Sequence, residues 1–356
     1  MPGPALMFAS IALRPLLLLP RLSHVRLCSA ASKYPEWALA PPELAEEWVA
    51  CAISHSECVA LNALKGDAPK DGTVLLDEVP ASITSDLGLR KPSAIELTPT
   101  HVNLIHNENP AFIPWKFIAK IVKKKKVGAW NIPSDCDDEP ELIQGFSETT
   151  SRTASLLPVE GGAPTAVLGG FNMHRMKGID PGIDTANKLS ALGGAKAGGL
   201  RGRILDVCTG LGYTCIGAAR TPFVDEVVTI ELDPLMVEMQ RANPWSAELF
   251  EHEKITRLLG DATEILPELP EKHFNFVVHD PPANAMSGEL YSLAFYTELR
   301  RVLTDSGTLF HYVGDPSSKA SGKLFKGIIE RLRDAGFAGE VKTVQKAYGI
   351  VARCGG

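Results

Sequence analysis

Short apolar runs alternate with longer amphipathic stretches along the C-terminal half of the chain, an order typical of a parallel α/β sheet. The apolar runs predict five strands, at residues 204–205, 227–230, 255–259, 274–278 and 308–312. The stretches between them predict helices at residues 213–220, 235–242, 263–266, 288–303 and 324–335. Two further strands, 339–344 and 348–352, should form a hairpin at the sheet edge. This pattern predicts an α/β fold with a Rossmann-like, doubly wound sheet.

The pattern before residue 163 differs, because its apolar runs are shorter and Pro and Gly separate them. Residues 43–64 predict a short helical region, and residues 73–76, 93–97 and 101–106 predict strands. Ser, Thr and Gly are frequent in residues 147–162, which predicts a linker or loop. We therefore expect a small β-rich region ahead of the α/β domain.

The first 33 residues are basic and rich in serine, with Arg14, Arg21, Arg26 and Lys33 but no acid before Glu36. Such a leader is typical of an organelle transit peptide, with the mitochondrion favoured over the plastid. The alternative is a disordered tail on a cytoplasmic protein. The expected segments are a transit peptide at residues 1–33, a β-rich region with its linker at 34–162 and the α/β domain at 163–356.

The bulk composition is that of a globular protein, since the 356 residues are 45% hydrophobic and 22% charged. A net charge of −6 argues against a broad nucleic-acid-binding surface, so we expect no DNA partner. The apolar run at residues 16–19 is too short to span a membrane, so we expect no membrane partner. The four lysines at 123–126 predict a solvated face, or alternatively a phosphate-contacting patch for RNA, and acids at 135–141 largely cancel their field. The seven cysteines have no metal-ligand spacing, which predicts reduced thiols and no metal.

The stretch from Arg203 to Tyr213 reads RILDVCTGLGY and joins a strand to a glycine turn and a helix. Gly210 and Gly212 allow backbone angles closed to other residues and let a ligand touch the main chain. Glu231 ends the next apolar run, about twenty residues past the turn, where an acid holds ribose hydroxyls in nucleotide-binding sheets. The spacing therefore favours a ligand that contains a nucleoside.

Successive motifs of the chain resemble those of class I S-adenosylmethionine-dependent methyltransferases. They are Asp206-x-Cys208-x-Gly210-x-Gly212, Glu231, Gly260-Asp261-Ala262 and Asp280-Pro281-Pro282. More narrowly, residues 170–352 are similar to a group of predicted methyltransferases familiar from archaea, through the segments CTGLGYT, ANPWSAELF, HDPP and GELYSLAFY. Many relatives have glycine where this chain has Cys208.

This resemblance implies S-adenosyl-L-methionine as the cofactor, with Glu231 on the ribose and Asp261 at the adenine amino group. Asp261 is alternatively the N-cap of the helix that follows it, and the two roles are compatible. The implied cofactor-binding residues are Asp206, Cys208, Thr209, Gly210, Leu211, Gly212, Tyr213, Thr214, Glu231, Leu232, Asp233, Gly260, Asp261, Ala262, Asp280 and Pro281.

Methyl transfer is an in-line displacement at a sulfonium carbon, so the enzyme must align a nucleophile and remove any proton that it carries. Asp280 is the catalytic candidate for both tasks, because it ends the fourth strand beside the cofactor. His279 is a second candidate base, or else a histidine packed inward. Tyr291 is a third candidate that would line the acceptor pocket, or else belongs to the core.

The acceptor is left open as a small molecule, a protein or RNA. Asp/Asn-Pro-Pro followed by an aromatic residue marks amine methyltransferases, and here Ala283 stands in place of the aromatic.

The segment at residues 170–188 precedes the first strand of the α/β domain and contains Met173, His174, Arg175 and Lys177. These side chains are expected to close over the methionine end of the ligand, or alternatively to be surface charges and local packing. Asp184, followed by Thr185, is expected to cap the next helix.

Three other functions compete with methyl transfer. A polyamine aminopropyltransferase, which uses decarboxylated S-adenosylmethionine, matches GELYSLAFY and the preceding β region, but that family carries a Gly-Gly-Gly-Asp turn at the first motif. A non-catalytic cofactor-binding subunit would not need the complete set of motifs. A nicotinamide dehydrogenase needs glycine or alanine where Cys215 stands.

Overall fold

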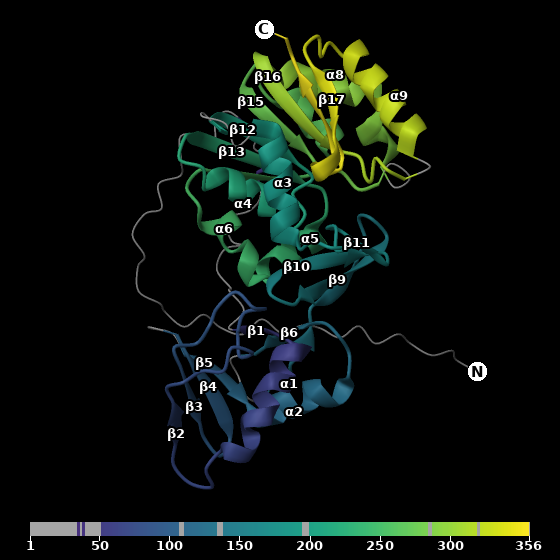
Figure 1. Cartoon of the computed structure of the whole chain (residues 1–356). Helices are drawn as coiled ribbons and strands as arrows, with labels where there is room; N and C mark the ends of the chain where they lie inside the picture. The colour runs from purple at the N-terminus through teal and green to yellow at the C-terminus, as the bar shows by residue number, and fades with distance from the viewer. Residues whose placement is uncertain are drawn as a thin grey trace, which may run out of the picture.

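The computed structural model describes residues 34–35, 38–39, 51–106, 110–133, 138–193, 199–283, 287–318 and 321–355 (Figure 1). The predicted transit peptide at residues 1–33 lies outside the described residues. None of the helices in the described ranges is long and apolar enough to cross a membrane.

A seven-stranded sheet with the order β14-β13-β12-β15-β16-β18-β17 forms the centre of the C-terminal half. Its strands are β12 (Gly202–Val207), β13 (Val224–Glu231), β14 (Ile255–Leu259), β15 (Phe274–His279), β16 (Leu303–Tyr312), β17 (Val341–Val344) and β18 (Gly349–Arg353). The first five strands in spatial order are parallel, and the β17–β18 hairpin is antiparallel at one edge. The predicted fold class is confirmed, including the hairpin.

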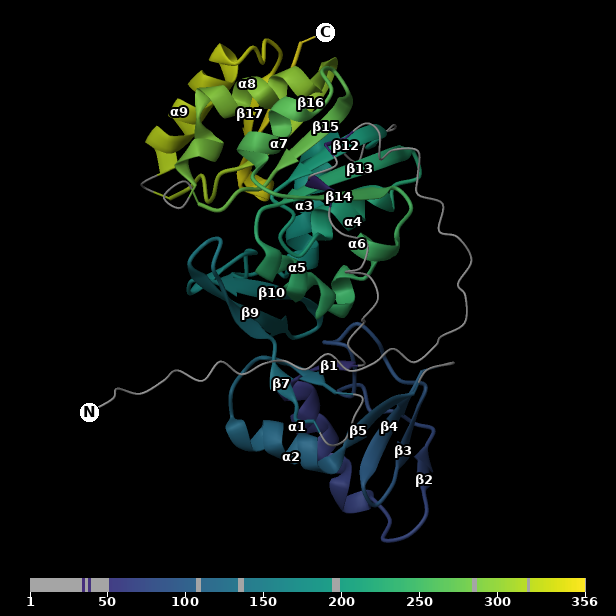
Figure 2. The same ribbon diagram turned by 180° about the vertical axis from the view of Figure 1, so that it is seen from behind.

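Helices cover both faces of this sheet (Figures 1 and 2). Neighbouring residues of one strand belong to opposite faces: Ile204 packs in the cluster with Leu192 of α3, and Leu205 packs in the cluster with Leu299 of α8. The α-helices of this half are α3 (Pro181–Gly193), α4 (Tyr213–Ala219), α5 (Pro234–Arg241), α6 (Glu248–Glu251), α7 (Ala262–Glu268), α8 (Leu293–Val302) and α9 (Ser321–Asp334). Short 3₁₀ helices are η5 (Pro244–Ser246), η6 (Gly288–Tyr291) and η7 (Gln345–Ala347).

The strand order reverses between β12 and β15, because the chain runs outward from β12 through β13 to β14 and then returns to the other side of β12. The carboxyl edge of the sheet at such a reversal is where open α/β sheets bind ligands. The glycine turn follows β12 and Asp280 follows β15, so the fold places both motifs at this point.

The N-terminal region contains two small sheets and two helices around a separate apolar core. The sheets are β2 (Val74–Leu76), β3 (Ala94–Leu97), β4 (His101–Ile105) and β5 (Ala111–Pro114), and β1 (Cys51–Ser54), β6 (Ala129–Ile132) and β7 (Glu141–Leu142). The two α-helices are α1 (His55–Ala63), which the 3₁₀ helix η4 (Leu64–Asp67) follows directly, and α2 (Trp115–Lys124). The three predicted strands are present.

The helix predicted at residues 43–64 is only partly correct. Residues 43–50 lie outside the described residues, and the next four pair as strand β1 with β6. The helix begins at His55, because Ser54 caps it: its hydroxyl accepts from the Glu57 N–H at 3.0 Å, and the Glu57 carboxylate accepts from the Ser54 N–H at 2.7 Å.

The linker predicted at residues 147–162 is wrong. These residues include all of β9 (Arg152–Val159), which pairs with β8 (Gln144–Ser147) and β10 (Gly162–Leu168) in a four-stranded sheet completed by β11 (Phe171–Asn172). Leu156 of this sheet packs with Leu235 and Met239 of α5. The predicted domain boundary after residue 162 therefore falls at the start of a paired strand.

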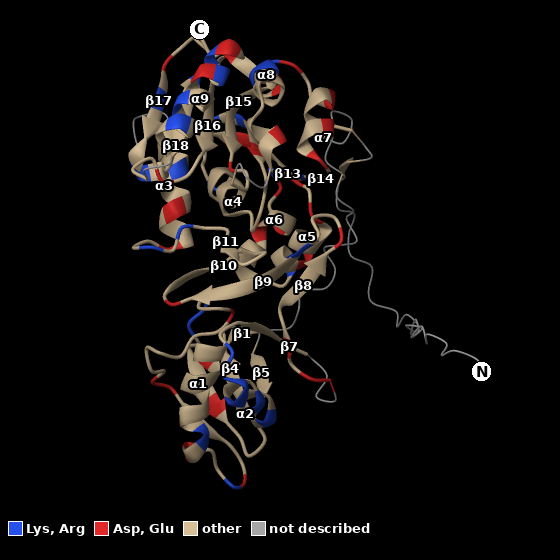
Figure 3. Cartoon of the chain, turned by 90° about the vertical axis from the view of Figure 1, so that its right-hand side faces the viewer, with Lys and Arg blue, Asp and Glu red and all other residues tan. Residues whose placement is uncertain are grey.

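The lysine run at residues 123–126 lies at the C-terminal end of α2 and is exposed (Figure 3). The Lys124 ammonium lies 4.6 Å from the centre of the Trp130 ring. Residues 134–137, which include the first part of the predicted acidic run, lie outside the described residues. The exposed lysine run at residues 123–126 therefore matches the predicted solvated face.

Candidate active site

The glycine turn after β12 needs unusual backbone angles at three positions. Cys208, Gly210 and Gly212 have φ values of 71°, 55° and 80°, all in the left-handed region. A Cβ atom on Gly210 would lie 2.7 Å from the sulfur of Met173, and one on Gly212 would lie 2.2 Å from a Leu249 methyl group. A side chain at either glycine would therefore strain the backbone and displace a neighbouring side chain. The backbone at Cys208 explains why glycine would suit that position too.

Asp206 lies beneath this turn and is buried. Its carboxylate accepts hydrogen bonds from the hydroxyls of Thr214 at 2.8 Å and Thr229 at 2.7 Å, which join β12, α4 and β13. Burial raises the pKa of Asp206 to about 7, although both hydroxyls act in the opposite direction. The arrangement supports the turn from below.

Glu231 connects the ends of β12 and β13. Its carboxylate accepts from the Gly210 N–H at 2.8 Å and from the Asp233 N–H at 3.0 Å. Burial raises the pKa of Glu231 to about 7, against the lowering effect of these backbone donors. Each oxygen keeps a second lone pair for a ligand hydroxyl, so the predicted ribose role fits the geometry.

The two residues after Glu231 differ in their surroundings. The side chain of Leu232 is 43% exposed at the edge of the sheet. Asp233 is buried as the N-cap of α5, where it accepts from the Leu235 N–H at 2.9 Å. It also accepts from the hydroxyls of Ser147 at 2.8 Å and Thr150 at 3.2 Å. Asp233 thus joins the β8–β9 sheet to the α/β sheet.

Asp261 is the N-cap of α7, as one of its two predicted roles requires. Its carboxylate accepts from the Thr263 N–H at 2.8 Å and from the Thr263 hydroxyl at 2.7 Å. The Gly260 N–H donates to the Glu231 carbonyl at 2.8 Å, and Ala262 starts the helix. A backbone hydrogen bond therefore joins the Gly260-Asp261-Ala262 motif directly to Glu231.

The remaining predicted cofactor residues surround the same turn. The Thr209 hydroxyl lies 2.6 Å from the Thr229 hydroxyl, and the Tyr213 hydroxyl donates to the Pro164 carbonyl at 2.8 Å. Leu211 is 1% exposed and packs in the apolar cluster with Leu235. Pro281 is buried directly after Asp280.

Asp280 lies beside the glycine turn, since its N–H donates to the Val207 carbonyl at 3.2 Å. Its side chain is 21% exposed, and one carboxylate oxygen accepts from the Lys188 ammonium at 2.5 Å. Burial raises the pKa of Asp280, and the charge of Lys188 opposes this rise. The carboxylate is thus held in place by a cation while it keeps access to solvent.

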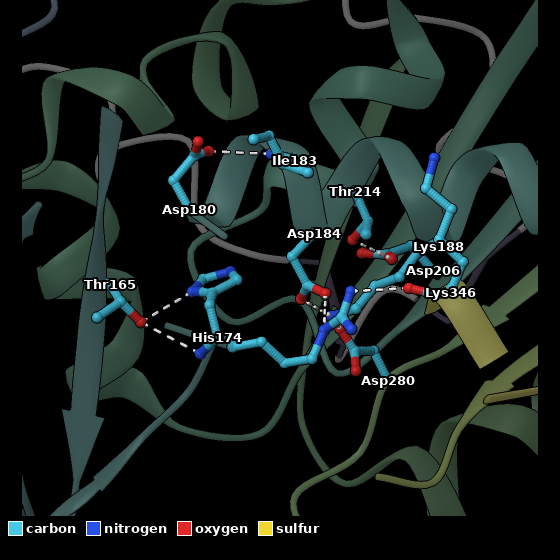
Figure 4. Close-up of polar contacts among 11 residues, drawn as sticks. Thr165, His174, Asp180, Ile183, Asp184, Lys188, Asp206, Thr214, Asp280 and Lys346 are labelled. Atoms are coloured by element: carbon cyan, nitrogen blue, oxygen red, sulfur yellow. Dashed lines mark hydrogen bonds and ion pairs between the residues drawn. The ribbon is translucent and has the colours of Figure 1, made fainter. Parts of the chain in front are cut away.

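A chain of alternating charges extends from Asp280 (Figure 4). The Lys188 nitrogen also lies 3.0 Å from an Asp184 carboxylate oxygen. The other Asp184 oxygen accepts from Nε of Arg175 at 2.5 Å. Arg175 in turn donates to the Lys346 carbonyl at 3.0 Å.

The predicted capping role of Asp184 and Thr185 is wrong. Helix α3 begins at Pro181, and the Asp180 carboxylate accepts from the Ile183 N–H at 3.0 Å in its first turn. Asp184 lies inside the helix and is fully buried, because its carboxylate serves the ion pairs.

Sequence reasoning did not single out Lys188. The signal in the sequence is its spacing of four residues from Asp184, which places both side chains on one face of a helix.

The segment that contains Met173 and Arg175 lies against the glycine turn, because the Met173 side chain lies next to Gly210; its role at the methionine end of the ligand stays a prediction. His174 instead contacts the Thr165 hydroxyl at 2.9 Å, and burial lowers its pKa to about 3. Lys177 is exposed. Within this segment, Arg175 is the residue that joins the charged chain.

His279 is packed inward, as its alternative interpretation requires. It is fully buried, stacks on His311 with ring centres 4.6 Å apart and has Nε2 3.0 Å from the Leu290 carbonyl. Burial lowers its pKa to about 4. Successive residues of a strand point to opposite faces, so His279 faces the α8 side while Asp280 follows at the strand end.

Tyr291 is buried, and its hydroxyl donates to the Pro282 carbonyl at 2.9 Å. It therefore holds the loop after Asp280. Tyr291 belongs to the same core cluster as Phe295 and Tyr296 of α8, which agrees with its core interpretation.

No family model matches the chain. It is 45% identical over 190 residues to an uncharacterized protein of Methanocaldococcus jannaschii, a match covering 53% of this chain and 63% of that protein. It is 31% identical over 161 residues to polyamine aminopropyltransferase 2 of Streptomyces coelicolor, covering 44% of this chain and 29% of that protein. The chain thus spans less than two thirds of the length of both curated relatives.

A crystal structure of spermidine synthase in complex with the transition-state analogue AdoDATO matches with a TM-score of 0.51 and 15% sequence identity. The match covers 65% of this chain and 78% of that one. Together these findings define a class: the chain has the fold of the S-adenosylmethionine-related transferases. The fold by itself does not say which group is transferred.

Proposed function

We propose that this protein is an S-adenosylmethionine-dependent methyltransferase in which Asp280 orients or deprotonates the acceptor. The observation that carries the proposal is the position of the Asp280 carboxylate. It lies at the carboxyl end of β15, beside the glycine turn of β12, and Lys188 holds it at 2.5 Å. A carboxylate at this point can face both the reacting methyl group and the incoming nucleophile.

The neighbouring motifs supply the cofactor site of this proposal. Glu231 would accept the ribose hydroxyls, because its carboxylate is anchored to the turn by the Gly210 N–H. Asp261 would meet the adenine amino group while it caps α7. Gly210 and Gly212 would let the methionine part approach the main chain.

The chemical step needs few protein groups, because the sulfonium already makes sulfur a good leaving group. A lone pair of the acceptor attacks the methyl carbon, the S–CH₃ bond breaks, and its electron pair returns to sulfur. If the acceptor carries a proton, the Asp280 carboxylate takes it or orients the donor for its loss to water. Holding the two reactants in line supplies much of the acceleration.

Leu211 favours methyl transfer over aminopropyl transfer. Polyamine aminopropyltransferases carry a Gly-Gly-Gly-Asp sequence in the turn after the first strand. In this chain Leu211 stands at the position of that aspartate. Its buried, apolar side chain offers no partner to the ammonium group of decarboxylated S-adenosylmethionine. The retained alternative is aminopropyl transfer, which the 31% identity to the Streptomyces coelicolor aminopropyltransferase favours.

Isothermal titration calorimetry tests this choice with S-adenosylmethionine, decarboxylated S-adenosylmethionine and NAD. The methyltransferase proposal expects S-adenosylmethionine to bind most tightly, by at least about tenfold or ~1.4 kcal/mol. Tighter binding of decarboxylated S-adenosylmethionine, together with transfer of its aminopropyl group to a polyamine, would overturn it. Binding of NAD alone would exclude both transferases.

A further inference from the structure

Lys188 is a buried cation in direct contact with the carboxylate assigned to the reaction. We propose that Lys188 is the positioning residue of Asp280: its ammonium aims one carboxylate oxygen and keeps the group ionised. The opposing charge of Asp184 sets how strongly it does so. This inference rests on the role proposed for Asp280 and adds to it the device that controls that carboxylate.

The geometry around Lys188 leaves it little freedom. The side chain extends from α3 and is 2% exposed, with its nitrogen 2.5 Å from Asp280 and 3.0 Å from Asp184. The same nitrogen lies 4.8 Å from the centre of the Tyr312 ring. An ammonium group so far from water stays charged only when anions surround it. Accordingly, burial lowers the pKa of Lys188, but the two carboxylates outweigh burial and raise it overall.

Arg175 decides how the charge of Lys188 is divided. A lysine between two carboxylates would be shared between them, but Arg175 contacts Asp184 from the other side at 2.5 Å. Arg175 is itself fixed, because its guanidinium lies 4.1 Å from the centre of the Tyr348 ring and donates to the Lys346 carbonyl. Arg175 pairs with the Asp184 oxygen that Lys188 does not contact, and its positive charge offsets part of the Asp184 charge, so more of the Lys188 charge acts on Asp280.

The charged groups around Asp280 determine in which direction each substitution should shift its pKa. Lys188 and Arg175 lower the pKa of Asp280, whereas burial, which has the largest effect, and Asp184 raise it. The titratable groups that face Asp280 come from several elements, namely Asp184 and Lys188 of α3, Arg175 before it, Asp206 of β12, Cys208 of the turn, Tyr291 of η6 and Tyr312 of β16. Removing Lys188 and removing the charge of Asp184 should therefore shift Asp280 in opposite directions.

The test is a titration of Asp280 by ¹³C NMR of the full chain with labelled aspartate carboxyl groups, assigned by comparison with D280N. In K188M the Asp280 pKa should rise by roughly 1–3 units, because an opposite charge in contact is lost. In D184N it should fall, because a like charge is lost. The control is K326M, which removes an exposed lysine of α9 paired with Glu330 and should leave the titration unchanged.

A purely structural lysine would give a different result. K188M would then unfold at a lower temperature while Asp280 titrated as in the wild type, and this outcome would overturn the inference. Where K188M does not fold, D184N decides alone: an unchanged or raised Asp280 pKa refutes the assignment. Calorimetry of S-adenosylmethionine with the wild type separates the two ideas, since absent binding rejects the proposed function but leaves the titration result standing.

Discussion

Replacing Glu231 by alanine tests the cofactor site where the geometry is most explicit. The substitution removes the acceptor for the ribose hydroxyls and for the backbone N–H groups of Gly210 and Asp233. The unpaired backbone donors cost folding stability in the free and the bound protein alike, whereas leaving the ribose donors unpaired costs about 1–3 kcal/mol of binding free energy, or roughly 5–150-fold weaker binding of S-adenosylmethionine. Calorimetry measures this change directly. The matched control is D225A, which removes an exposed acid from the other end of β13 and should bind as the wild type does.

The pH dependence of binding gives the same prediction a second, independent readout. Burial raises the pKa of Glu231 from 4.5 to about 7, so the folded protein holds this proton more tightly than the unfolded chain between those values. The contribution of Glu231 to folding stability therefore falls as the pH rises through that window. Ribose hydroxyls donate to the carboxylate and favour its charged form. Affinity should therefore weaken below about pH 7, by at most about tenfold per pH unit for one proton.

The variant E231Q keeps the shape but cannot change its charge, so its affinity should depend less on pH. Two results would refute the reasoning. One is an E231A dissociation constant equal to that of the wild type. The other is an E231Q variant that retains the full pH slope.

Two further predictions concern the catalytic group and the turn. D280N should bind S-adenosylmethionine normally. Its turnover should fall about 10²–10⁴-fold if the acceptor must lose a proton, and only slightly if the acceptor reacts as a neutral amine. Single-turnover assays measure this loss, and full turnover in D280A would place the chemistry elsewhere. C208G should change the free energy of unfolding in urea only slightly. Glycine relieves the strain of the left-handed backbone at this position, about 1–2 kcal/mol, and this gain offsets the added conformational entropy of the unfolded chain, about 0.4–1 kcal/mol. C215A is the control, since it removes a fully buried side chain from α4 and should destabilise the fold; an equal loss in both variants contradicts the strain argument.

Local patterns predicted the central sheet because its parallel strands are buried on both faces and read as nearly continuous apolar runs. The glycine turn was predictable for a similar reason, since its backbone angles admit few residues besides glycine. The face of His279 was left open, because a residue at a strand end can point toward either face.

The sheet that contains β9 and the role of Lys188 were missed for another reason. Ser and Thr in residues 147–162 favour turns locally, but pairing with β8 and β10 overrides that preference. Asp184 has the side chain of a good helix cap, yet its partners are Arg175 and Lys188. Lys188 and Asp280 are 92 positions apart in the sequence, so no local sequence pattern can predict that they are in contact.

Asp233 has a consequence for how this protein can be divided or recombined. Its carboxylate joins α5 to Ser147 and Thr150, and Leu156 covers apolar residues of the same helix. A fragment that starts at residue 163 would lose these contacts and expose the covered side chains to water. A fragment exchanged between relatives that is to keep the α/β sheet intact must therefore begin before β8.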